Sequence, residues 1–194
     1  MVQVLPPAEI VSPLVQELFG YWQSKSAGRL APCPRDIDPG DIKRLLPYIS
    51  ISDVLHDPFD LRFRLVGTGV VEAAGYDFTG RFFHDMPITT GVERWRAHYA
   101  RVIGEKRPFY GRYRGDLSPE LVRYVDHGAF PLSSDGVAVD RIIEIEDWSD
   151  IHGVNLSKVE LPIWQFEVLP AGIADKLSPD IDTNLATQPG DGSA

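Results

Sequence analysis

Cysteine is almost absent from this chain, since Cys33 is the only one among 194 residues. A single thiol excludes an internal disulfide and any metal site built from several cysteines, and it fits a reducing cytoplasm. Residues 1–10 lack the basic stretch and apolar run of a secretion signal, and no window of 18 residues is continuously apolar. We therefore expect a cytoplasmic protein with no membrane partner.

Basic charge is also scarce. The chain has 28 acidic and 19 basic side chains, a formal net charge of -9 and a pI near 5.0. This is the wrong sign for a protein that follows a phosphate backbone, so we expect no nucleic-acid partner. Hydrophobic residues make up 43% of the sequence, which is enough for one domain of ordinary size with a real core.

The usual signatures of catalysis and metal binding are missing. No G-x-S-x-G or comparable nucleophile motif occurs, and the five histidines, at positions 56, 84, 98, 127 and 152, include no pair three or four residues apart. We therefore predict no catalytic residue and no metal site. No motif identifies a cofactor.

The first predicted element is an amphipathic helix over residues 13–25. Ser12 followed by a proline is a good helix start. Leu18, Phe19 and Trp22 belong to a single apolar stripe at helical spacing. The stripe must be buried, either against the outer face of the chain's own sheet or against a second copy. We expect a homodimer with these three residues at or near its two-fold axis.

Strands dominate the rest of the sequence. Residues 48–55 and 60–67 flank the turn "HDPF" and predict an antiparallel hairpin, with Phe63 and Leu65 on one face. A capping box then begins a long helix that ends near residue 106, and three β-like runs follow at 108–115, 120–132 and 137–148. The order predicts an α+β fold, a five-stranded antiparallel sheet with short helices and one long helix on one face.

The segment 63–86, "FRLVGTGVVEAAGYDFTGRFFHDM", has four glycines, at positions 67, 69, 75 and 80. A phosphate-binding loop would gather its glycines in one turn before a long helix, and these are spread out among large apolar residues. We interpret them as residues that let short helices turn tightly over a sheet, as a pocket wall or a lid on the core.

These elements, in this order, resemble the PAS domain, and in particular a bacterial family of stand-alone PAS-like proteins. The stretches that carry the resemblance are "DIDPGDIKRLLPYISISDV", "FRLVGTGVVEAAGYDFTGR", "YGRYR" and "FPLSSDG". It covers roughly residues 15–149 and suggests an N-terminal helical extension at 1–30, a PAS-like domain at 31–150 and a C-terminal extension at 151–194. The last part, from about residue 171, is poor in large apolar side chains and is expected to be disordered.

The resemblance implies a non-catalytic sensor or interaction module, with a ligand cavity between the inner sheet face and the short helices. It implies a small-molecule ligand, an unidentified signalling protein as partner, and a homodimer. The residues expected to line the cavity are Phe63, Leu65, Val71, Tyr76, Phe82, Trp95, Tyr99, Tyr113 and Phe130. A packed aromatic core would use the same residue types.

The sequence gives less support to three other hypotheses. Haem-binding PAS domains take an axial histidine from the long helix or just before it, but His98 lies at the flank of the apolar stripe and is expected to be partly exposed, and His84 is a weaker candidate. PAS-type flavin photochemistry needs a cysteine in the short-helix region, which has none. The alternative from another class is a cone-shaped α+β isomerase or dehydratase using Asp77 or the pair Asp126 and His127, yet that fold has no helical insertion between its second and third strands.

Overall fold

An antiparallel sheet forms the middle layer of the molecule. The computed structural model describes residues 12–86, 92–118, 121–148 and 169–170. The strands are β1 (Ile49–His56), β2 (Phe59–Val66), β3 (Phe109–Ser118), β4 (Leu121–Leu132), β5 (Arg141–Asp147) and the two-residue β6 (Leu169–Pro170), in the order β2-β1-β5-β4-β3-β6. The predicted α+β, PAS-like fold with five antiparallel strands is confirmed, and β6 adds a short sixth strand beside β3. The predicted extension beyond residue 150 otherwise lies outside the described residues.

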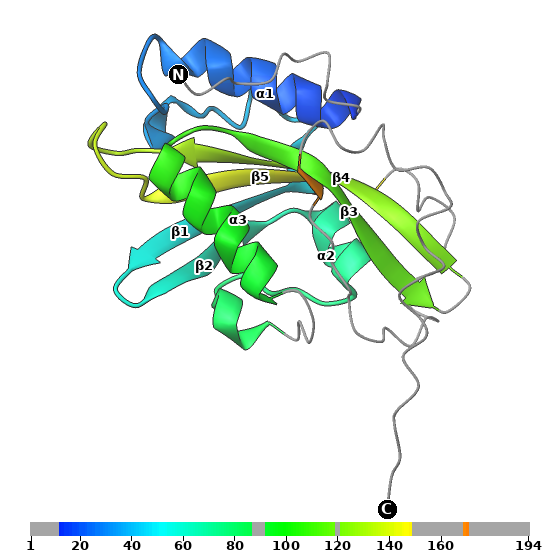
Figure 1. The fold of residues 1–194 in the computed structure, drawn as a ribbon. Helices are drawn as coiled ribbons and strands as arrows, with labels where there is room; N and C mark the ends of the chain where they lie inside the picture. The colour runs from blue at the N-terminus through cyan, green and yellow to red at the C-terminus, as the bar shows by residue number, and fades with distance from the viewer. Residues whose placement is uncertain (1–11, 87–91, 119–120, 149–168, 171–194) are drawn as a thin grey trace, which may run out of the picture.

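Helices cover both faces of this sheet (Figure 1). One face carries α2 (Thr68–Ala74), the 3-10 helix η4 (Phe83–Asp85) and the long α3 (Val92–Glu105). The other face carries α1 (Pro13–Ser26) and the following segment with η2 (Pro34–Asp36) and η3 (Leu46–Tyr48). We call the first layer the inner compartment and the second the outer compartment. None of the described helices combines the length and the apolar character that crossing a membrane requires.

The N-terminal helix belongs to the outer compartment. The Ser12 hydroxyl caps it by accepting a hydrogen bond from the backbone N–H of Val15, and donates one of 2.6 Å to the Asp147 carboxylate of β5. Leu18, Phe19 and Trp22 are buried against the sheet at 0%, 3% and 7% exposure. These three side chains were expected at a two-fold axis, and that placement is corrected, because the sheet of the same chain already covers them. The homodimer itself stays a prediction.

The segment between α1 and β1 completes the outer compartment. Between Asp38 and Pro47 the chain forms successive turns that end in η3. Backbone hydrogen bonds span three residues here, as from the Leu45 N–H to the Ile42 carbonyl at 2.8 Å. The tighter winding lays Ile42 and Leu45 on the sheet, where both are buried.

A β-bulge decides which face of β2 each side chain occupies. Ser52 of β1 pairs with Phe63, whereas the next partner of β1, Ile51, pairs with Leu65, so Arg64 is the extra residue. Phe63 therefore points into the inner compartment, and Leu65 points to the outer face, where it is 41% exposed. The prediction that the two share a face is wrong, because the bulge reverses the alternation between them.

Candidate functional site

The inner compartment holds a cluster of buried polar groups in an otherwise apolar core. Trp95, His98 and Tyr99 come from α3, at spacings of three and four residues that place them on one helix face. His127 comes from β4 and Glu144 from β5. All five residues are at most 9% exposed, so the chain buries two imidazoles, a phenol and a carboxyl group in one layer. We call these five residues the inner polar cluster.

Glu144 is the centre of the polar contacts. Its Oε1 lies 3.4 Å from His127 Nε2, and its Oε2 accepts a hydrogen bond of 3.2 Å from the Ser50 hydroxyl of β1. Burial raises the pKa of the Tyr99 phenol well above its usual value, and the charge of Glu144 and a hydrogen bond to it raise the pKa further. Buried carboxyl groups survive in a core when they are paired in this way.

His98 is surrounded by rings. The centroids of Trp95, Tyr99, His127 and Phe109 lie 5.6, 5.7, 5.2 and 6.1 Å from that of His98. Its Nε2 is buried and has no hydrogen-bond partner among the residues that the structure describes. Burial lowers the pKa of His98 well below the usual 6.5, with smaller contributions from His127 and Arg101, so the ring is neutral at pH 7.

A second polar atom in the same layer is also without a partner. The Ser52 hydroxyl of β1 is fully buried, and its Oγ makes no hydrogen bond within the described part of the chain. Ser50 and Ser52 alternate with Ile49 and Ile51, so the serines face the inner compartment and the isoleucines the outer one. Buried polar atoms without partners are rare in native proteins, and each such atom needs an explanation.

An ion-paired histidine lies on the surface near η4. His84 Nδ1 is 2.5 Å from Asp60 Oδ2, and His84 Nε2 is 3.2 Å from Asp85 Oδ1. The hydrogen bond to Asp60 raises the pKa of His84, and the two carboxylate charges add to this effect. The His84 side chain is 55% exposed, so this ion-paired histidine lies at the molecular surface, outside the inner compartment.

The predicted pocket residues fall in several places. Phe63, Trp95 and Tyr99 belong to the inner core, and Tyr76 packs against it. Val71 and Phe82 are partly exposed, and Phe82 stacks on His84 at 5.5 Å. The side chain of Tyr113 lies outside the described part of the structure. Two residues need correction: Leu65 and Phe130 face the outer compartment, where Phe130 contacts Phe19 and Trp22.

Sequence reasoning missed most of the inner polar cluster. His98 was expected to be partly exposed and is buried, and His127 was considered only as half of a pair with Asp126. Glu144 and Ser52 were not singled out. The sequence offers no clear signal for Glu144, because it alternates with Ile143 and Ile145 and is followed by Glu146, as an exposed residue of a half-buried strand would be.

The described residues contain no group of three or more histidine, cysteine, aspartate or glutamate side chains placed to hold a metal ion.

A scan against protein-family models matches residues 10–110 to the PAS domain. A search of curated proteins returns no match.

Proposed function

The chain belongs to the PAS domain family, and on this premise we propose that it is a non-catalytic sensory module that binds a small ligand in the inner compartment and acts on a partner protein. PAS domains are in general sensory and signalling modules. The proposal has three parts: this chain binds a small ligand, it acts on a partner protein, and it has no catalytic activity.

One observation carries the ligand proposal: His98 Nε2 is a buried nitrogen that finds no hydrogen-bond partner in residues 12–86, 92–118, 121–148 and 169–170. An unpaired buried polar group destabilises a core by roughly 1–3 kcal/mol, and a ligand that offers a partner removes this penalty. Ser52 Oγ, on strand β1 of the sheet, is a second buried polar atom without a partner among the described residues. A neutral imidazole and a hydroxyl suit a small polar ligand, and the rings around His98 suit one with a flat or apolar body.

The first experiment looks for a ligand that copurifies with the full chain. The protein is denatured, and the released small molecules are identified by mass spectrometry. The matched variant is His98→Phe, which keeps a ring of similar size but removes the unpaired nitrogen. We expect the wild-type chain to release a compound that H98F does not retain.

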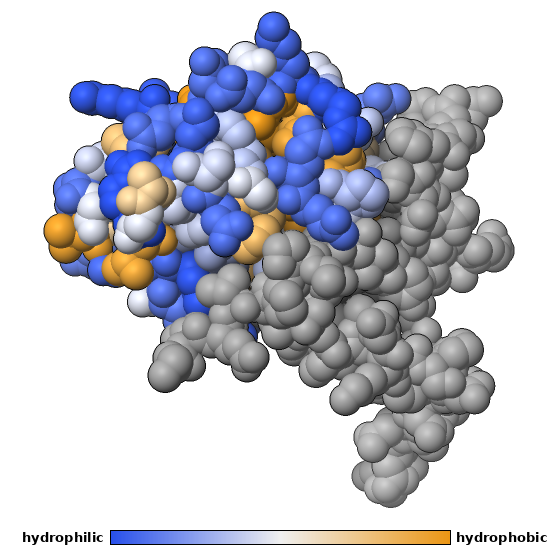
Figure 2. All heavy atoms as spheres, turned by 90° about the horizontal axis from the view of Figure 1, so that it is seen from above, coloured by the Kyte–Doolittle hydropathy of each residue, from blue (hydrophilic) through white to orange (hydrophobic). Residues whose placement is uncertain are grey.

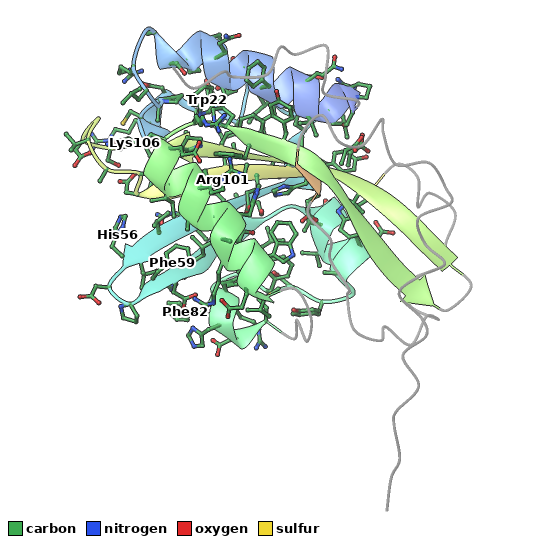
Figure 3. All side chains as sticks on the ribbon, in the orientation of Figure 1. Trp22, His56, Phe59, Phe82, Arg101 and Lys106 are labelled. Atoms are coloured by element: carbon green, nitrogen blue, oxygen red, sulfur yellow. The ribbon has the colours of Figure 1, made fainter. Side chains whose placement is uncertain are left out.

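The stability of H98F separates binding from folding. Replacing an unpaired buried polar group with an apolar one of similar shape leaves the ligand-free fold as stable or more stable. His56, exposed at the β1–β2 turn (Figure 3), gives the control H56F, which should retain the compound. A folded H98F that keeps the same compound would contradict the proposal.

Assembly is a separate part of the proposal. We expect a homodimer whose contact does not use the buried stripe of α1. Light scattering at micromolar concentration tests it, and a mass of 21.6 kDa would overturn it.

A further inference from the structure

A groove on the outer face of the sheet is separate from the inner polar cluster. It has a volume of about 390 Å³ and lies between β1, β2 and the segment that precedes β1. Pockets that hold small ligands typically measure about 300–1,000 Å³. Its lining residues are mostly aliphatic: Ile37, Pro39, Ile42, Lys43, Leu46, Pro47, Ile49, Ile51, Leu65, Val66, Gly67, Thr68 and Ile143.

The β-bulge and a close backbone contact build this groove. Because of the bulge, Leu65 joins Ile51 on the floor instead of entering the inner core. At the wall, Gly67 lies so close to η3 that a Cβ atom there would be 2.3 Å from the Leu46 carbonyl oxygen and 2.5 Å from that of Pro47. The Gly67 N–H also donates a hydrogen bond of 2.7 Å to the Ile49 carbonyl. Wall and floor are therefore held together without a ligand.

The chemistry of the lining selects one kind of occupant. Among the described residues, the large side chains of the lining are branched aliphatic groups and prolines, without an aromatic ring or a carboxyl group. The exposed Lys43 is the one charged residue in this described lining. The neighbouring Asp41 is already paired with Lys25 at 3.0 Å, so it does not neutralise Lys43. Figure 2 views the molecule from the side of α1 and shows hydrophilic residues over most of the described surface. Apolar residues on this side form only small patches.

We propose that this groove binds a free medium-chain carboxylate, with the aliphatic chain on Ile51 and Leu65 and the carboxylate at Lys43. The apolar lining supplies the burial of the methylene groups, and Lys43 supplies charge complementarity for the head group. The net charge of -9 opposes general attraction of anions, so binding depends on these local contacts. This site is independent of the ligand proposed for the inner compartment.

Decanoate is the probe, titrated into the full chain at a fixed protein concentration. Calorimetry should give one site, and methyl NMR should show shifts at Ile51, Leu65 and Ile143. Decanol, which has the same chain without the charge, should bind about three- to fivefold more weakly, the upper part of the range that an exposed ion pair supplies.

Five variants test the roles of the residues. K43E should weaken decanoate binding at least about threefold and K43R should restore it, whereas K106E, at the end of α3 on the other side of the sheet (Figure 3), should change nothing. L65Q should weaken binding of both probes. Its control is L55Q, because Leu55 is 37% exposed on β1, close to the 41% of Leu65, and does not line the groove.

Four outcomes would overturn the proposal. They are no decanoate binding at millimolar concentration, equal affinity for decanoate and decanol, shifts confined to inner methyl groups such as those of Val102 and Val125, and groove shifts that follow protein concentration without decanoate. The third would assign the probe to the inner compartment, and the fourth would assign the groove to a second copy of the chain. Because the two sites lie on opposite faces, failure here leaves the H98F experiment unaffected.

Discussion

The indole Nε1 of Trp22 donates a hydrogen bond of 2.7 Å to the backbone carbonyl of Pro131. The donor lies in the middle of α1 and the acceptor near the end of β4, 109 residues later in the chain. The ring also packs 6.4 Å from that of Phe130, and it points from α1 toward the sheet (Figure 3). This contact makes the N-terminal helix part of the domain core.

Replacing Trp22 with alanine should therefore destabilise the monomeric fold. We expect the free energy of unfolding to fall by about 3–5 kcal/mol, the usual loss for a large buried aromatic residue. Urea denaturation followed by circular dichroism measures it. The control is Q23A, an exposed neighbour on the same helix that should change stability by less than about 0.5 kcal/mol. A W22A chain as stable as Q23A would mean that α1 is only peripheral.

Two glycine substitutions should have opposite effects. Gly67→Ala places a Cβ atom against the backbone of Leu46 and Pro47 and should destabilise the fold by about 1–3 kcal/mol. Gly20→Ala, in the exposed interior of α1, meets nothing within 4 Å and should stabilise it by up to about 1 kcal/mol. Thermal denaturation of both variants gives the comparison. A stabilised G67A would show that η3 can move away from β2.

His98 should make the fold sensitive to acid. The pKa of His98 is lowered in the folded state. Below about pH 6.5, His98 therefore binds a proton in the unfolded chain but not in the folded chain. Stability should fall as pH falls below that value and should not depend on this group above it. Urea denaturation across pH 5–8 should give a steeper acid loss for the wild-type chain than for H98F. Parallel curves would refute the lowered pKa.

His84 should act in the opposite sense. Its folded pKa is raised by Asp60, so the pair contributes fully below about pH 6.5 and the contribution is lost as pH rises through the folded pKa. H84Q should therefore be less stable than the wild-type chain at pH 5.5 and equal to it at pH 9. The control H56Q alters an exposed histidine at the hairpin turn. NMR titration of the His84 ring reads its pKa directly, and a value below 6.5 would contradict this prediction.

The sequence predicted the order of the elements well and the faces of the strands poorly. Periodicity and turn residues located the β1–β2 hairpin, α3 and the three later strands within a few residues, because these signals are local. The sheet is buried on both faces, so an apolar residue such as Phe130 does not reveal which compartment it enters. The bulge at Arg64 reversed the alternation without any local signal, and Leu65 was misplaced for that reason.

The inner polar cluster was difficult to predict for a different reason. Its members lie on α3, β4 and β5, and only the tertiary fold brings His98, His127 and Glu144 within one layer. A histidine at the edge of a helical stripe is usually exposed, and here it is buried against the rings of Phe109 on β3 and His127 on β4. Residue type and spacing alone therefore gave too little weight to these residues.

Neighbouring residues on the central strands serve opposite compartments. Ile143 lines the outer groove, while the next residue, Glu144, binds Ser50 and faces His127 in the inner layer. Ile51 and Ser52 of β1 divide in the same way. A displacement of either strand therefore moves side chains in both compartments, because residues that are adjacent in the strand face opposite sides. If a ligand in one compartment strengthens binding in the other, the second ligand must strengthen binding of the first by the same factor. The two faces of this sheet are linked by this thermodynamic reciprocity.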